Sequence, residues 1–278
     1  MKTNLLLEII YKKNTSIMGV LNITPDSFSD GGLYYKPEDA INKAKQHIKS
    51  GVDILDIGGQ STRPGANFVS PEEELNRILP IVRTLRKLHP NLILSVDTFH
   101  SKVAEEVLNI GVDVINDVTG GRHDPKILDV ISASKCTFVI THSRGNSKTM
   151  NDFACYKNVG VEVFNELMIQ VDKAINAGIS SDRIIIDPGL GFAKDNKQNI
   201  TLLANLEKFT NTKYPVLVGP SRKRFIGHVL NESDPKKRLL GSLAVVCRCV
   251  QAKVNIVRVH DIKETSQVIN MSNYLWNY

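Results

Sequence analysis

The sequence is poor in cysteine and has no long apolar run. Its four cysteines are scattered through 278 residues, which is too few for a disulfide framework in a chain of this length. We expect them to be reduced thiols packed in or near helices. No stretch approaches the ~20 consecutive apolar residues of a membrane-spanning helix, and Glu8 interrupts the early leucines with no cleavage site after them. These absences predict a cytoplasmic protein that has no membrane partner.

The chain also lacks a strong concentration of charge. Lys and Arg number 35 and Asp and Glu 29, for a formal net charge of +6. The basic residues cluster only at 222–224 and 236–238, and no aromatic residues are interleaved with them as a single-strand binding groove would require. We therefore expect no nucleic-acid partner, whereas a small anionic ligand suits the mild positive excess.

What the chain does have is a repeated pattern. With 42% hydrophobic and 23% charged residues it can bury a large core. Short β-branched apolar runs alternate with amphipathic helical stretches at 37–50, 71–88, 101–110, 159–177 and 236–252. The eight apolar runs are residues 16–23, 52–57, 92–96, 112–115, 137–140, 183–186, 214–218 and 254–259.

Eight strands that alternate with helices predict a parallel sheet, and eight is the number that closes a (β/α)8 TIM barrel. The α/β alternative is an open, doubly wound sheet. That fold would favour a G-x-G-x-x-G turn after the first strand, which the sequence MGVLN at 18–22 does not supply. No linker or shift in composition marks a second domain, so we predict one barrel domain over residues 1–278. We expect the first fifteen residues to form a short element that closes the bottom of the barrel.

Polar residues follow every predicted strand. In a TIM barrel the chemistry takes place at the carboxyl ends of the strands, so these side chains should meet at one rim. A single one would suggest only a turn residue, but a polar group after each strand predicts a site. They are Asn22, Asp56, Asp97, Asn116 with Asp117, His142, Asp187, Ser221 with Lys223, and Arg258 with His260.

The types of residue indicate the chemistry. Carboxylates and an amide after strands three, four and six can bond to a flat heterocycle that carries N–H groups, and the cations after strands seven and eight suit an anion. No H-E-x-x-H or G-x-S-x-G motif is present. Two polar loops with glycines, 24–32 and 60–66, are candidate lids. The pattern favours binding and electrostatic stabilisation over covalent catalysis.

These residues form motifs that resemble the dihydropteroate synthase family. The two longest are MGVLNITPDSFSDGG at 18–32 and DIGGQSTRPGA at 56–66. Shorter matches follow in the same order: SVDT at 95–98, IND at 115–117, IDPGLGF at 186–192, SRK at 221–223 and RVHD at 258–261. The resemblance covers essentially the whole chain.

The resemblance implies a magnesium-dependent, homodimeric transferase of folate biosynthesis and a sulfonamide target. Such an enzyme joins 6-hydroxymethyl-7,8-dihydropterin pyrophosphate to p-aminobenzoate, and we expect an SN1-like path. It implies a catalytic set of Asp97, Asp26, Lys223, Arg258 and His260. The implied ligands of the pterin are Asp97, Asn116, Asp187 and Lys223. Those of the pyrophosphate are Asn22, Arg258 and His260, with Asn22 also near magnesium, and those of p-aminobenzoate are Phe28, Thr62, Arg63, Pro64 and Ser221.

Some positions depart from the family pattern. Gln60 stands where Glu is expected, Thr141 and Ser143 flank the histidine where Met is commoner, and Ala193 replaces a frequent Gly. Arg224 stands where some members have a Ser near the benzoate carboxylate, which bears on sulfonamide sensitivity. Two other functions stay open: a pterin-binding methyltetrahydrofolate–corrinoid methyltransferase, and a non-catalytic pterin-binding protein that would release no pyrophosphate.

Overall fold

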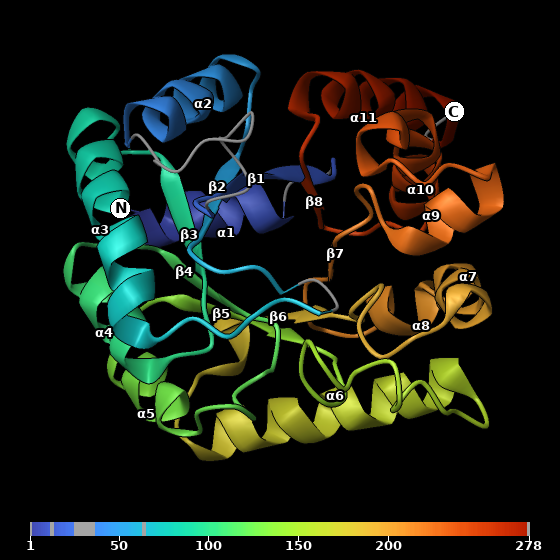
Figure 1. The fold of residues 1–278 in the computed structure, drawn as a ribbon, viewed down its shortest axis with the longest axis horizontal. Helices are drawn as coiled ribbons and strands as arrows, with labels where there is room; N and C mark the ends of the chain where they lie inside the picture. Colours follow the sequence, from blue (N-terminus) through green and yellow to red (C-terminus); the bar gives the residue numbers. More distant parts are fainter. Residues whose placement is uncertain (1, 12–13, 25–36, 63–64, 277–278) are drawn as a thin grey trace.

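The computed structural model describes residues 2–11, 14–24, 37–62 and 65–276. Eight parallel strands form a single curled sheet at the centre, and the helices lie around it (Figure 1). The predicted TIM barrel is confirmed. The strands are β1 (Ser16–Asn22), β2 (Ile54–Gly58), β3 (Ile93–Asp97), β4 (Val114–Asp117), β5 (Thr137–Thr141), β6 (Ile184–Asp187), β7 (Leu217–Val218) and β8 (Ile256–Val259).

The barrel is nearly closed. The order of the strands is β6-β5-β4-β3-β2-β1-β8-β7, so β1 pairs with both β2 and β8. Between β6 and β7 the ladder is reduced to one bridge, Ile186 with Val216, and Ile186 N donates to Pro215 O at 2.9 Å. This joint is the weakest part of the circumference, because each hydrogen bond that a ladder lacks is one less tie between neighbouring strands.

The helices follow the predicted alternation, with one difference. The stretch at 236–252 divides into a 3-10 turn, η3 (Pro235–Lys237), and a helix that begins at Leu239. The short helices α5, α7, α8 and α9 were not predicted individually. The helices are α1 (Lys2–Tyr11), α2 (Pro37–Lys49), α3 (Pro71–Leu88), α4 (Ser101–Asn109), α5 (Lys126–Ala133), α6 (Val159–Asn176), α7 (Asn196–Ala204), α8 (Glu207–Thr210), α9 (Arg224–Leu230), α10 (Leu239–Gln251) and α11 (Ile262–Trp276).

Helix α3 illustrates why these segments become helical. The Ser70 side chain caps it by accepting from Glu73 N at 3.2 Å, and Pro71 occupies the first turn, where its missing N–H is no loss. Acidic residues lie in the first turn and Arg86 and Lys87 in the last, as the helix dipole favours.

The core has two layers. The outer layer lies between the strands and the surrounding helices. The inner layer fills the half of the barrel nearer the amino ends of the strands. There Leu6 and Ile10 of α1 pack against inward apolar side chains of the strands. This confirms the predicted element that closes the bottom of the barrel. Within the described ranges no helix is both long and apolar enough to cross a membrane. The inner residues are Met18, Ile54, Ile93, Val114, Val139, Ile185, Leu217 and Ile256.

Candidate active site

The side chains inside the barrel become polar toward the carboxyl ends of the strands. Side chains alternate between the two faces of a strand, so residues two and four positions after an inner apolar residue also point inward. Eight polar residues of the strands meet this condition, and they form a polar layer between the apolar layer and the carboxyl ends of the strands. They are Asn22, Asp56, Ser95, Asp97, Asn116, Thr141, Asp187 and Arg258.

Asp56 lies at the centre of this layer and is completely buried. It accepts hydrogen bonds from Ser95 Oγ at 2.6 Å, Asn116 Nδ2 at 3.2 Å and Arg258 Nε at 2.6 Å. Its partners come from three other strands. The sequence placed Asp56 at the rim without a role, because alternation shows which way a side chain points but not what it meets.

Arg258 bridges two carboxylates. Besides the bond to Asp56, its Nη2 donates to Asp97 Oδ2 at 2.8 Å. The Arg258 side chain is 22% exposed, while the two carboxylates are almost fully buried. The guanidinium therefore holds two negative charges that would otherwise repel each other in a poorly hydrated space.

Asp97 titrates close to neutral pH. Burial raises its pKa to about 7; Arg258 opposes the shift, and Asp56 and Asp117 add to it.

Asp187 and Lys223 complete the inner cluster on the side of β6 and β7. Asp187 Oδ1 accepts from Gly189 N at 2.7 Å, and burial raises the pKa of this carboxyl group. The positive charge of Lys223 lowers the pKa of both Asp187 and Asp97, so its ammonium group lies near both carboxyl groups. Its Nζ is 4.8 Å from the centre of the Phe192 ring. The structure brings together all four side chains predicted to hold the pterin.

The residues predicted to bind the anion come from β1, from β8 and from just after β8, and these two strands are neighbours in the sheet. His260 Nδ1 is 2.9 Å from Ser221 Oγ, which links the ends of β8 and β7. A Cβ built on Gly58 would lie 3.5 Å from both Asn22 Oδ1 and Asp97 Cβ, so these two side chains flank the same glycine.

Two of the predicted rim residues face away from the barrel. His142 lies three positions after the inward Val139, so alternation turns it outward. Its Nε2 is 3.1 Å from Glu166 on α6. Asp117 likewise turns outward and accepts from Thr119 N at 2.6 Å and Gly121 N at 2.7 Å.

The residues predicted to bind p-aminobenzoate are described only in part. Thr62 is half-buried at the start of the second loop, whereas Phe28, Arg63 and Pro64 lie outside the described residues. Asp26 of the predicted catalytic set lies outside them too. Beyond them the loop is tied to the segment after β5. Gly65 N donates to Ser147 O at 2.8 Å, and Ser147 Oγ donates to Ala66 O at 2.9 Å.

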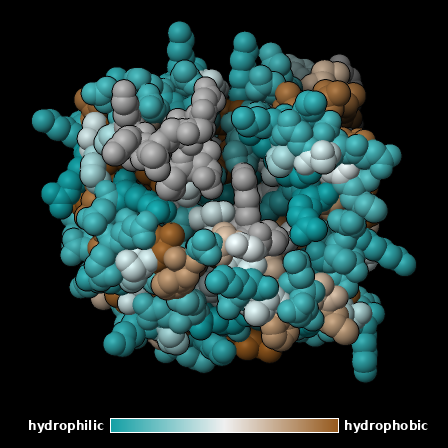
Figure 2. Space-filling view, in the orientation of Figure 1, coloured by the Kyte–Doolittle hydropathy of each residue, from teal (hydrophilic) through white to brown (hydrophobic). Residues whose placement is uncertain are grey.

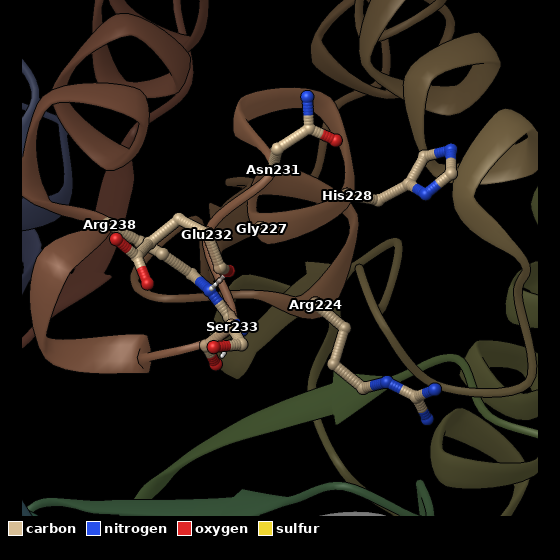
Figure 3. A pocket seen from close by; sticks show the side chains of 7 residues that line it. All are labelled: Arg224, Gly227, His228, Asn231, Glu232, Ser233 and Arg238. Carbon is tan, nitrogen blue, oxygen red and sulfur yellow. Dashed lines mark hydrogen bonds between the residues drawn. The ribbon is translucent and has the colours of Figure 1, made fainter.

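A pocket of about 360 Å³ lies beside α9, and Figure 3 shows the side chains that line it. Arg224 and His228 point away from its inner wall, where Arg238 is packed. Arg238 donates to Glu232 O at 3.0 Å, Ser233 O at 2.5 Å and Arg222 O at 3.2 Å. The pocket contains none of the predicted pterin ligands, and Arg238 serves to fix the backbone just before Lys223.

A buried carboxyl group supports the base of the second loop. Glu74 of α3 is fully buried, and Gln60 Nε2 donates to its Oε2 at 2.9 Å. Burial raises the pKa of Glu74 to about 8. Gln60, one of the departures from the family pattern, suits this neighbour because a Glu at position 60 would place two carboxyl groups together.

Replacing Glu74 with Gln should remove part of the pH dependence of stability. The folded state holds the Glu74 proton more tightly than the unfolded chain, so its contribution is complete below pH ~4.5 and is lost as the pH rises through about 8. We expect the wild type to lose up to about 1.4 kcal/mol per pH unit relative to Glu74→Gln in this window. Urea midpoints at pH 5, 6.5 and 8 measure this difference. A constant difference between the two proteins would contradict the prediction.

Comparisons with known proteins agree with this geometry. A family model described as pterin binding enzyme matches residues 18–260. A dihydropteroate synthase of Synechocystis sp. is 44% identical over 264 residues, which cover 95% of this chain and 91% of that protein. The chain belongs to the dihydropteroate synthase family.

Solved dihydropteroate synthases have the same fold. One from Clostridium difficile, determined in the presence of pteroic acid, superimposes with a TM-score of 0.89 at 38% identity and covers 96% of this chain and 98% of its own. Another, from Xanthomonas albilineans with 4-aminobenzoic acid, has a TM-score of 0.88 at 38% identity. The match covers 95% of this chain and 93% of the Xanthomonas chain. Family and fold are therefore confirmed, while the roles of individual residues stay predictions.

Proposed function

We propose that the polar layer inside the barrel is the catalytic site of a dihydropteroate synthase. The enzyme joins 6-hydroxymethyl-7,8-dihydropterin pyrophosphate to p-aminobenzoate, which gives 7,8-dihydropteroate and pyrophosphate in folate biosynthesis. The observation that carries the assignment of residues is the Asp56–Arg258–Asp97 cluster. In this cluster the Arg258 guanidinium, which we assign to the leaving group, contacts the Asp97 carboxylate, which we assign to the pterin.

The pterin ring would lie against the inner carboxylates. Asp97, Asn116 and Asp187 offer acceptors and an amide to its N–H and carbonyl groups, and Lys223 offers an ammonium group near both acids. These residues come from the strands β3, β4 and β6 and from the segment after β7. A flat ring could therefore be held around much of its edge.

The chemical step begins with rupture of the C–O bond to pyrophosphate. The electron pair leaves with the pyrophosphate, which Arg258, His260 and Asn22 would hold, and the exocyclic methylene becomes positive. The ionised Asp97 would stabilise this cation, which is conjugated to the pterin. The amine of p-aminobenzoate then attacks the methylene and loses a proton. This SN1-like path requires positioning more than a strong base.

Magnesium fits one part of the site. Among the described residues no three His, Cys, Asp or Glu side chains gather to hold a metal ion. The Asn22 amide oxygen beside Asp97 is, however, a hard oxygen ligand of the kind that Mg²⁺ shares with phosphate oxygens. Asn22 would hold the ion together with the pyrophosphate, where magnesium supplies positive charge to the leaving group.

The p-aminobenzoate site would be formed by Phe28, Thr62, Arg63, Pro64 and Ser221, with Asp26 helping to order the complex. Arg63→Ala should raise KM for p-aminobenzoate about tenfold or more and leave KM for the pterin substrate nearly unchanged. Steady-state kinetics with each substrate varied in turn measures the two constants. Equal loss for both substrates would show that the site is not divided in this way.

Release of pyrophosphate tests the activity itself. The purified protein, the pterin pyrophosphate and magnesium are incubated with and without p-aminobenzoate, and both pyrophosphate and dihydropteroate are followed. Release coupled to product supports the synthase, and slow release without p-aminobenzoate supports the SN1-like path. Pterin binding with no release in either case would leave a binding protein.

We further propose a cytoplasmic homodimer. The outer faces of α10 and α11 expose several large apolar side chains, among them Leu240 at 79% and Tyr274 at 72%. Figure 2 shows apolar atoms at the upper right, where Figure 1 draws the ends of these helices. An exposed apolar area on a second copy could cover them. All four cysteines are free thiols, which suits a reducing compartment.

A further inference from the structure

Lys194 is a buried lysine that the proposed reaction does not use. It lies near the end of the segment between β6 and α7, residues 188–195, called loop 6 below. Its Nζ is 2.9 Å from Gly189 O, 2.9 Å from Phe192 O and 3.0 Å from His142 Nδ1. An ammonium group has three N–H donors, so these contacts use all of them.

The contact with His142 connects Lys194 to a hydrogen-bond network that reaches α6. Lys194 can only donate, so His142 Nδ1 must accept and its Nε2 carries the hydrogen. That Nε2 donates to Glu166 Oε2 at 3.1 Å. Arg144 Nε donates to the same oxygen at 3.0 Å, and its guanidinium lies 3.9 Å from the centre of the Tyr156 ring. Lys194 therefore ties loop 6 to a network anchored on α6.

Loop 6 needs such ties because its backbone is unusual. Gly189, Gly191 and Ala193 all have positive φ, at 70°, 82° and 49°. The left-handed conformation costs about 1–2 kcal/mol for a residue with a Cβ, so Ala193 persists only because the surroundings hold it. Another tie is Asn199, whose Oδ1 accepts from Gly191 N at 2.7 Å.

The same loop sets the position of two groups in the pterin pocket. Gly189 N donates to Asp187 Oδ1, and the Phe192 ring supports the Lys223 ammonium group. A Cβ built on Gly191 would lie 3.2 Å from Lys223 Cδ. A shift of loop 6 would therefore move a carboxylate and an ammonium group together.

We propose that Lys194 is a positioning residue, which fixes loop 6 on His142 and so holds Asp187 and Lys223 in the geometry that binds the pterin. It does not touch the substrate. This inference rests on the proposed roles of Asp187 and Lys223. Burial lowers the pKa of Lys194 to about 7, with Asp187 opposing the shift and Lys223 adding to it. Burying a charged lysine is unfavourable unless hydrogen bonds compensate, so the three contacts of Lys194 indicate a specific role for this residue.

Steady-state kinetics of Lys194→Met tests the proposal, because Met keeps the volume and removes the three donors. We expect KM for the pterin pyrophosphate to rise roughly tenfold or more, as for a displaced binding group, while KM for p-aminobenzoate stays within about twofold. Lys194→Gln, which keeps two N–H donors, should recover part of the loss. Lys197→Met is the matched control, since Lys197 is exposed on α7, and its constants should equal those of the wild type.

Asp187→Asn separates this inference from the proposed pocket. If Asp187→Asn weakens pterin use but Lys194→Met does not, the positioning role is wrong and the pocket stands. If neither does, the pocket itself is wrong, and the inference falls with it. An equal rise in both KM values for Lys194→Met also overturns the proposal. Circular dichroism melts check folding; if neither Lys194 variant folds, the residue supports the whole barrel and the proposal fails.

Discussion

Replacing Asp97 with Asn is expected to lower kcat by roughly 100-fold or more, the size of effect seen when a preorganised electrostatic group is removed. The substitution keeps the shape of the side chain and its contact with Arg258 and removes the negative charge. In the proposed mechanism that charge stabilises the cation formed when pyrophosphate leaves. Single-turnover measurement of dihydropteroate formation, with both substrates saturating, reports this step directly.

The pH dependence provides the control for this prediction. Burial raises the pKa of Asp97 to about 7 in the free protein. If its ionised form is the active one, kcat/KM for the pterin substrate rises with pH through about 7 and levels off above it. Asp97→Asn should lose this limb of the profile. Unchanged turnover, or an unchanged acidic limb, would remove Asp97 from the chemical step.

Replacing Arg258 with Met is expected to impair both activity and folding. The change leaves Asp56 and Asp97 without the cation that lies between them, and removing one partner of a buried pair costs about 3–5 kcal/mol. It also removes a bidentate donor proposed for the leaving pyrophosphate, so kcat/KM should fall by about 100-fold or more. Urea unfolding and steady-state kinetics on the same preparation separate the two effects.

Arg258→Lys is the matched variant for this experiment. Lysine keeps the positive charge but lacks the planar fork that reaches both carboxylates. Its stability should therefore lie nearer to the wild type than that of the Met variant, while much of the activity remains lost. A Met variant as stable as the wild type would mean that one of the two acids takes up a proton. The acidic limb of the pH profile would then be shifted.

The sequence was sufficient for the architecture and for the direction of the inner side chains. Alternation along β3 and β8 places Asp97 and Arg258 inside the barrel, and the residues predicted for the pterin do lie together. The pairing of Arg258 with Asp56 could not be read in this way. Contacts between β2 and β8 depend on side-chain lengths across a closed interior, and no local pattern records them.

The errors have similar physical causes. His142 was placed at the rim because it follows β5, yet its parity relative to Val139 turns it toward α6. The helices α5, α7, α8 and α9, which were not predicted individually, have four to nine residues each, so an apolar period has few turns over which to repeat. The buried Lys194 carried no signal, because a lysine near a helix start is usually exposed.

The short pairing between β6 and β7 means that the substrate can contribute to the stability of the barrel. Only one bridge connects these strands, and Asp187 lies on one side of the joint while Lys223 follows the other. A pterin hydrogen-bonded to both residues would connect the two sides of this joint, as main-chain hydrogen bonds connect the other neighbouring strands. The stabilisation of the folded state by bound pterin would then include the free energy of closing this joint.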